Sequence, residues 1–176
     1  QKDQVNIYFA RANVLHKDKN YKESYNYLEK ANKLKLILNP SNPQNRLKKS
    51  EVLLIESNKK EIKKDNKNFP ESIFIVGMPR CGSTLLESIL SMNKKVEDLG
   101  EINILEESFL NWRKLDPEVT LAELYFEKIN HYFKKLKTTT NKWLYNYQYV
   151  GIISSQIPNS KIIHCFRNPL DNILSI

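Results

Sequence analysis

The sequence predicts an α/β fold, in which a truncated parallel sheet of the P-loop type is flanked by helices and preceded by an α-helical hairpin. Residues 73–76 and 161–166 are mostly apolar runs of the kind found in buried parallel strands. Helical patterns lie between and after these runs, and such alternation is typical of α/β domains. The turn after the first run carries two glycines at the spacing of a phosphate-binding loop. These observations predict a ligand site where the strands end.

Residues 1–38 are predicted to contain two antiparallel helices, over about residues 5–35. The positions expected to line their faces are Tyr8, Arg11, Ala12, Leu15, Tyr21, Ser24, Leu28 and Ala31. The order of aromatic, small and large residues at these offsets resembles a single tetratricopeptide repeat. This resemblance implies a protein partner and further repeats before Gln1, because one repeat cannot bury its own faces. A generic amphipathic hairpin fits the same pattern.

Residues 39–69 are predicted to be a linker that contains a basic helix. The prolines of Asn39–Pro43 break the preceding helix. A basic amphipathic helix is then expected over about residues 44–64, with a polar stretch before Pro70. The side chains predicted to face inward are those of Leu47, Leu54, Ile55 and Ile62.

About half of the net charge of +8 lies in this linker, where seven lysines and Arg46 outweigh four acidic residues between Asn42 and Asn68. Such a run forms a solvated helix face or attracts an anionic partner. Nucleic acid is not expected as a partner, because the segment lacks interleaved aromatic residues and a recognised binding module.

Composition and cysteine usage favour a folded cytoplasmic protein. Forty per cent of the residues are hydrophobic, which is enough for a packed core. Two cysteines make no disulfide framework, so a reducing compartment is expected. No apolar run approaches the ~20 residues of a membrane helix, and no membrane partner is expected. The chain starts at Gln1 without Met and stops at Ile176, so we expect a fragment.

Residues 70–176 are predicted to form the α/β domain. Helices are expected over residues 84–92, 103–114, 120–137 and 146–156, and after Asn168 and Pro169. Thr120 and Glu123 have the spacing of a capping box. The helix that they open is predicted to bury Leu121, Leu124, Tyr125, Tyr132, Phe133 and Leu136.

The turn after the first strand has the length of a nucleotide P-loop but a different cation. Gly77 and Gly82 keep the glycine spacing, whereas Ser83 stands where nucleotide-hydrolysing loops have lysine. Arg80 supplies the positive charge instead. Backbone N–H groups at the start of a helix, with hydroxyls from Ser83 and Thr84 and the fork of Arg80, are suited to phosphate oxygens. The loop is therefore predicted to bind a phosphate-like group.

The end of the second strand provides a similar signal. Arg167 follows this strand directly, where ligands bind in open parallel sheets. Ser175 lies eight residues later, about two helical turns, and should return to the same face. This pair can bind a second phosphate, although pairing of Arg167 with Asp171 is an adequate structural alternative.

Together the two motifs resemble those of a known family. Phe-Ile-Val-Gly-Met-Pro-Arg-Cys-Gly-Ser-Thr-Leu-Leu at 74–86 is similar to the 5′-phosphosulfate loop of sulfotransferases that use 3′-phosphoadenosine 5′-phosphosulfate. Lys-Ile-Ile-His-Cys-Phe-Arg-Asn-Pro-Leu-Asp-Asn-Ile-Leu-Ser at 161–175 is similar to their 3′-phosphate motif. Bacterial tetratricopeptide-repeat sulfotransferases, which are similar to tyrosylprotein sulfotransferases, are the nearest match. The resemblance implies that 70–176 is the N-terminal part of such a domain.

The resemblance also implies roles for particular residues. The residues expected to bind the co-substrate are Arg80, Cys81, Gly82, Ser83, Thr84 and Leu85 at the 5′-phosphosulfate, and Arg167 and Ser175 at the 3′-phosphate. Cys81 stands where Ser is usual. Glu101 matches the general base that deprotonates the acceptor hydroxyl, with Glu97 as competitor because one extra residue precedes Gly100. Lys142 matches a lysine that neutralises the transferring group, and Arg80 assists it.

The predicted reaction is transfer of a sulfuryl group to a hydroxyl acceptor, most plausibly protein tyrosine and otherwise a saccharide. Like phosphoryl transfer, it depends mainly on positioning and electrostatics. No metal is expected, because protein cations replace magnesium. The alternative of a different class is a noncatalytic repeat-containing scaffold, and retention of Arg80, Ser83 and Arg167 favours a working site.

Two other enzyme classes fit less well. A P-loop kinase would need lysine at position 83 and a magnesium-binding aspartate at a strand end. A cysteine phosphatase would need an arginine six residues after its cysteine, and Asp171 and Glu87 occupy those places for Cys165 and Cys81. Both cysteines are therefore expected to be small buried residues, and His164 a core histidine of the strand.

Overall fold

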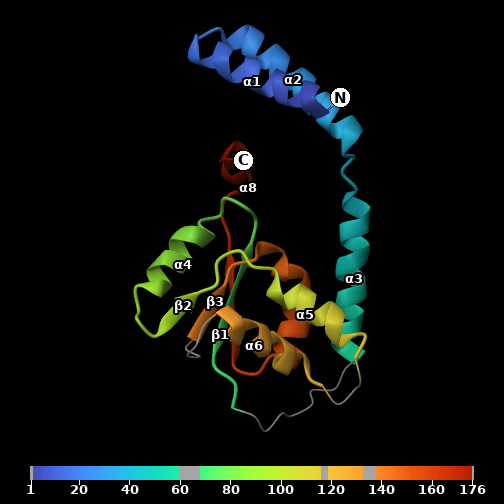
Figure 1. Cartoon of the computed structure of the whole chain (residues 1–176), viewed down its shortest axis with the longest axis vertical. Coiled ribbons are helices and arrows are strands. Elements are labelled where there is room, and N and C mark those ends of the chain that lie inside the picture. Colours follow the sequence, from blue (N-terminus) through green and yellow to red (C-terminus); the bar gives the residue numbers. More distant parts are fainter. Residues whose placement is uncertain (1, 60–67, 116–118, 133–137, 176) are drawn as a thin grey trace. The chain divides into compact units, whose positions relative to one another are not determined.

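The computed structural model describes residues 2–59, 68–115, 119–132 and 138–175 (Figure 1). The chain divides into two compact units, Gln1–Leu47 and Lys48–Ile176. The first is helical, and the second contains the sheet. The predicted α/β class is confirmed for the second unit. No described helix is both long and apolar enough to cross a lipid bilayer.

The first unit is a hairpin of helices α1 (Lys2–Lys17) and α2 (Tyr21–Leu38), which lie side by side in Figure 1. Small residues allow this close approach: Ala12 and Ala31 are buried, and the buried Ser24 hydroxyl donates a hydrogen bond of 2.9 Å to the Ala12 carbonyl. The expected pair of helices is thus present. Its identity as a tetratricopeptide repeat stays a prediction.

The basic helix predicted within the linker is present as α3 (Pro43–Lys59), but its buried face differs from the predicted one. Leu53 is buried, whereas Leu47, Leu54 and Ile55 are more than half exposed. Ile62 lies outside the described residues. Ion pairs one turn before and one turn after Leu53 hold α3 to helix α5 (Ile104–Trp112). Lys49 pairs with Glu106 of α5, and Glu56 pairs at 2.9 Å with Arg113, the C-cap of α5. Those pairs select the face, which the apolar pattern alone did not identify.

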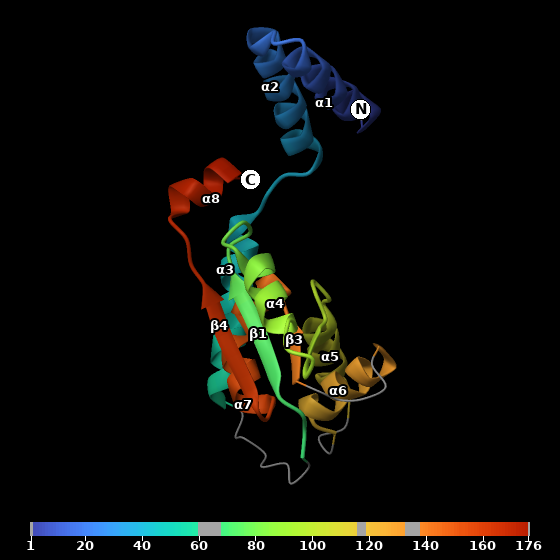
Figure 2. The same cartoon turned by 90° about the vertical axis from the view of Figure 1, so that its left-hand side faces the viewer.

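The sheet of the second unit has four parallel strands in the order β2-β3-β1-β4. They are β1 (Ser72–Gly77), β2 (Val96–Asp98), β3 (Thr138–Asn141) and β4 (Ser160–Cys165). Figure 2 shows β4, β1 and β3 side by side. The sequence predicted β1 and β4, whose registers pair Gly77 with Cys165. It did not predict β2 and β3, because both are short and polar.

The helices of this unit are close to those predicted. They are α4 (Ser83–Ser91), α5 (Ile104–Trp112), α6 (Leu121–Tyr132), α7 (Val150–Gln156) and α8 (Pro169–Ser175), with a 3₁₀ helix η1 (Leu144–Tyr149) before α7. The capping box of α6 is confirmed: the Thr120 N–H donates to Glu123 at 2.8 Å, and the Glu123 N–H donates to the Thr120 hydroxyl at 3.2 Å. Residues 133–137, the predicted end of this helix, lie outside the described residues.

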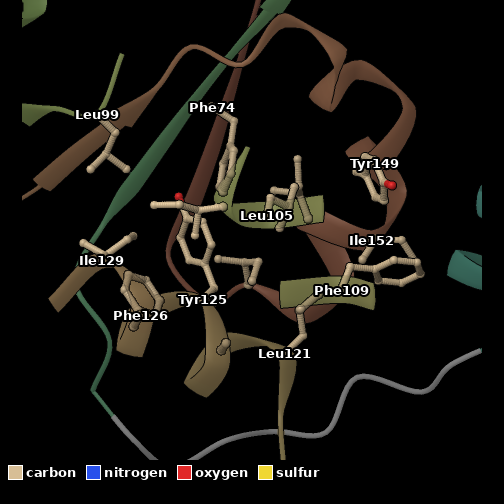
Figure 3. Packing of buried hydrophobic residues seen from close by; sticks show 14 of the residues in the cluster. Phe74, Leu99, Leu105, Phe109, Leu121, Tyr125, Phe126, Ile129, Tyr149 and Ile152 are labelled. Carbon is tan, nitrogen blue, oxygen red and sulfur yellow. The ribbon is translucent and has the colours of Figure 1, made fainter. Parts of the chain in front are cut away.

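The hydrophobic core joins strand β1 to helices α5, α6 and α7 (Figure 3). Phe74 of β1 packs against Tyr125 of α6 with ring centroids 5.5 Å apart, and Phe109 packs edge-on against Tyr149 at 5.4 Å. Leu121 and Tyr125 are buried as predicted. Each such side chain contributes about 1.5–3 kcal/mol on burial, so this cluster fixes the sheet against its helices. The side chains of Tyr132, Phe133 and Leu136 lie outside the described residues.

Three expectations about strand β4 and the cysteines are wrong. His164 is exposed rather than in the core, and Cys81 and Cys165 are half-buried. Strand β4 has β1 on one side and, among the described residues, no strand on the other. Strand β4 is accordingly less buried than β1 along its length, and His164 stays exposed.

Candidate functional site

The loop between β1 and α4 has the backbone geometry that an anion-binding turn requires. Gly77 has a φ of 153°, Gly82 has a φ of 97° as the N-cap of α4, and Arg80 has a φ of 68°. A Cβ on Gly77 would lie 2.4 Å from the Cys165 carbonyl oxygen, so only glycine fits there. A left-handed backbone at a non-glycine residue such as Arg80 is a form of strain that concentrates at ligand sites.

The two predicted motifs meet because β1 and β4 are neighbouring parallel strands. The Arg80 side chain donates through Nε to both the carbonyl and the hydroxyl of Ser175, each at 3.1 Å. The Arg167 guanidinium donates to the Arg80 carbonyl at 3.4 Å. Residues almost one hundred positions apart thus form one cationic cluster at the carboxyl edge of the sheet.

A pocket of about 410 Å³ opens at this edge. Seven of the predicted site residues line it: Arg80, Gly82, Ser83, Thr84, Glu101, Arg167 and Ser175. The two arginines therefore face one cavity from two motifs. A Cβ on Gly82 would meet nothing within 4 Å, so the space in front of the helix N-terminus is open to a ligand.

Three predicted residues are not among those that line the pocket. Leu85 points outward and is 68% exposed. Cys81 lies beside Gly77 and Cys165. Lys142 is almost fully buried behind the pocket, but its Nζ donates to Glu101 Oε1 at 2.7 Å. The competitor Glu97 lies on β2 and does not line the pocket.

Glu101 and Lys142 are adjacent because the residues that follow β2 and β3 continue the backbone hydrogen bonding between the two strands. The Lys142 N–H donates to the Gly100 carbonyl at 2.9 Å, one residue past the end of β3. Gly100 has a φ of 60°, which turns the chain so that Glu101 follows at the pocket wall. The Glu101 side chain is 60% exposed, whereas that of Lys142 is only 6% exposed. The carboxylate can therefore reach a ligand while its partner stays inside.

A residue that sequence reasoning missed, Glu87, lies behind this pair. Its Oε1 accepts from the Thr140 hydroxyl at 3.0 Å, and its Oε2 is 3.8 Å from Lys142 Nζ. Burial raises the pKa of the Glu87 carboxyl; the Thr140 hydrogen bond and the Lys142 charge oppose that rise, and Asp98 adds to it. The available signal was a single charged residue in a helix otherwise made of serine, threonine and apolar residues.

The remaining wall of the pocket, which sequence reasoning also missed, is largely aromatic. Trp143 and Tyr145 contribute to it from the start of η1, with ring centroids 5.6 Å apart. Asn141 fixes this turn by accepting from the Trp143 N–H at 3.1 Å and from the Asn146 amide at 3.0 Å. The buried Trp143 Nε1 has no hydrogen-bond partner among the described residues.

The same described ranges contain no cluster of three or more histidine, cysteine or acidic side chains arranged to hold a metal ion.

Comparison with known proteins identifies the class of this domain. The model of the sulfotransferase domain family matches residues 70–176, and the chain belongs to this family. An uncharacterized protein of Aquifex aeolicus (strain VF5) is 28% identical over 190 residues, which cover 95% of this chain and 25% of the relative. The chain thus spans about a quarter of the length of that relative.

Proposed function

We propose that this domain transfers the sulfuryl group of 3′-phosphoadenosine 5′-phosphosulfate to a hydroxyl group, with protein tyrosine as the first candidate acceptor. The observation that carries the proposal is the single pocket that receives Arg80 and Arg167 from two separate motifs. Two anion-binding groups in one cavity suit a ligand with phosphates at two positions. The acid–base pair Glu101–Lys142 borders the same cavity.

The residues of the pocket fit such a donor. The open space before the α4 N-terminus, the Arg80 guanidinium and the Ser83 and Thr84 hydroxyls can hold the 5′-phosphosulfate. Arg167 and Ser175 can hold the 3′-phosphate. Arg80 already donates to the Ser175 hydroxyl, so its fork is oriented across the pocket before a ligand arrives. When bound, the donor supplies a sulfuryl group on a good leaving group.

The residues of the chain then have distinct roles. Glu101 accepts the proton as the O–H bond of the acceptor breaks, and the acceptor oxygen forms a bond to sulfur. The bond from sulfur to the bridging oxygen breaks, and 3′-phosphoadenosine 5′-phosphate leaves with that electron pair. Arg80, Lys142 and the loop N–H groups stabilise the charge that develops on these oxygens.

The aromatic wall supports an acceptor with a ring. Trp143 and Tyr145 line the same pocket as Glu101, and their rings offer faces on which a phenol ring can pack. A sugar ring can use the same surface, so a saccharide is the second candidate acceptor. Transfer of labelled sulfate to tyrosine peptides but not to oligosaccharides would distinguish them.

Donor binding is tested by calorimetry of the full-length protein with 3′,5′-bisphosphoadenosine. Arg80→Ala and Arg167→Ala should each weaken binding about 10- to 100-fold, because each removes charge-assisted hydrogen bonds worth about 1.5–3 kcal/mol. Arg113→Ala is the matched control, since Arg113 pairs with Glu56 away from the pocket and its loss should leave the affinity unchanged. Equal affinity in all four proteins would refute the assigned pocket.

A further inference from the structure

Helix α4 carries one acidic residue, Glu87, and the fold buries it. The residue is 6% exposed, and its helix is otherwise made of serine, threonine and apolar residues. Burying a carboxylate is costly unless hydrogen bonds and an opposite charge compensate. Burial of this carboxylate therefore carries a desolvation cost that an apolar residue at the same position would not have.

The two carboxylate oxygens of Glu87 have different partners. Thr140 on β3 anchors Oε1 at 3.0 Å, and this hydroxyl is itself fully buried. Oε2 lies 3.8 Å from Lys142 Nζ, close enough for an ion pair but too far for a hydrogen bond. Asp98 on β2 and the backbone N–H of Gly100 also act on the carboxyl. Glu87 is thus held fixed on the side away from the pocket.

Lys142 lies between two carboxylates of very different exposure. The Glu101 side chain on the pocket side is 60% exposed and accepts a hydrogen bond of 2.7 Å from the ammonium, whereas the Glu87 side chain on the inner side is 8% exposed. If Glu101 takes the acceptor proton, its negative charge is lost. A buried ammonium left without any counter-charge would be strongly disfavoured. The Glu87 carboxylate on the inner side would still supply a counter-charge to Lys142.

We propose that Glu87 is a positioning residue for sulfuryl transfer: it is the standing counter-ion that holds Lys142 in place while Glu101 exchanges its proton. The inference rests on the proposed function, because it assigns Glu87 a part in that reaction. Glu87 touches neither donor nor acceptor and acts through Lys142.

The test compares Glu87→Gln with wild type in the full-length protein. The amide keeps the shape and can still accept from Thr140, but it carries no charge. We expect kcat to fall about tenfold or more, which corresponds to the loss of about 1.4 kcal/mol of transition-state stabilisation. KM for the donor, affinity for 3′,5′-bisphosphoadenosine and the unfolding midpoint should stay close to those of wild type. Glu107→Gln, which breaks an ion pair with Lys128 on the surface, is the matched control and should leave kcat unchanged.

A double-mutant cycle with Lys142→Ala identifies the route of the effect. If Glu87 acts through Lys142, adding Glu87→Gln to Lys142→Ala should cost almost nothing further. Additive losses, or a kcat in Glu87→Gln equal to that of wild type, would overturn the inference while wild-type transfer upholds the proposed function. A wild-type protein without transfer activity would overturn the proposed function itself.

Thr140→Val gives a second variant should Glu87→Gln fail to fold. It removes the hydroxyl that anchors Oε1 and keeps the volume of the side chain. A smaller fall in kcat with unchanged KM is expected, and no change in kcat would count against the proposal.

Discussion

At the scale of single residues, the loop after β1 depends on backbone conformations that few side chains tolerate. Gly77 has left-handed φ and lies directly against the Cys165 carbonyl, so it sets how closely the two motif-bearing strands approach. Gly82 has a left-handed φ too, but faces open space. The first glycine therefore serves packing, and the second leaves room for an anion.

These two roles predict different outcomes for alanine substitution. Gly77→Ala should destabilise the domain by about 2 kcal/mol or more, because a clash with backbone adds to the strain of its φ. Gly82→Ala should cost less stability, since only the strain remains, but should weaken binding of 3′,5′-bisphosphoadenosine. Urea unfolding measures the first effect and calorimetry the second. Equal stability losses in the two variants would contradict this division.

The site illustrates at this scale what sequence could predict. Arg80, Ser83, Arg167 and Ser175 were identified because loop chemistry and position at a strand end are local signals. Glu87 and Trp143 were not, because their importance depends on which elements come together in space. Nothing in the sequence around Glu87 shows that Thr140 and Lys142 lie against it.

At the scale of elements, strand β3 and the turn after it connect the core to the site. The strand is polar but buried, and its side chains hydrogen-bond to neighbouring elements. The Thr139 hydroxyl, for example, lies 3.0 Å from the hydroxyl of Ser72 on β1. Asn141 ends the strand and holds the following turn through its side-chain amide oxygen Oδ1. The next residue is Lys142, so the order of this turn sets the position of the ammonium.

Asn141→Ala should therefore reduce both stability and catalysis. It leaves the buried Asn146 amide and the Trp143 N–H without their acceptor, which costs about 2–3 kcal/mol in total. We also expect a lower kcat, because the turn that carries Lys142 and Trp143 loses its anchor. Urea unfolding and steady-state kinetics check both effects. Ser154→Ala, at an exposed serine that bonds within α7, is the control, and a stable, fully active Asn141→Ala protein would contradict the account.

Helices and strands were predicted correctly where the sequence carries an apolar pattern or a capping motif, and were missed where it carries neither. Strands β1 and β4 were recognised from continuous apolar residues, and α6 from its capping box. Strand β3 is formed by three threonines and an asparagine, whose buried hydrogen bonds cannot be inferred from hydrophobic periodicity. The buried face of α3 was mistaken for a similar reason, because the ion pairs of Lys49 and Glu56 decide it.

At the scale of the whole molecule, the second unit places two anion-binding motifs on neighbouring parallel strands and the acid–base pair beside them. The sequence predicted that the two motifs would meet, because the carboxyl ends of parallel strands lie at one edge of a sheet; Glu101 and Lys142 were placed by the family resemblance. The sequence could not predict the strand order β2-β3-β1-β4, which brings Glu101 and Lys142 to the pocket from the side opposite β4.

The central claim is that this one pocket holds both ends of a doubly phosphorylated nucleotide. A crystal structure of the full-length protein with 3′-phosphoadenosine 5′-phosphate tests it most directly. The account predicts the 5′-phosphate at the N-terminus of α4, against Arg80 and Ser83, and the 3′-phosphate between Arg167 and Ser175. A nucleotide bound elsewhere, or one whose 3′-phosphate does not contact Arg167, would contradict it.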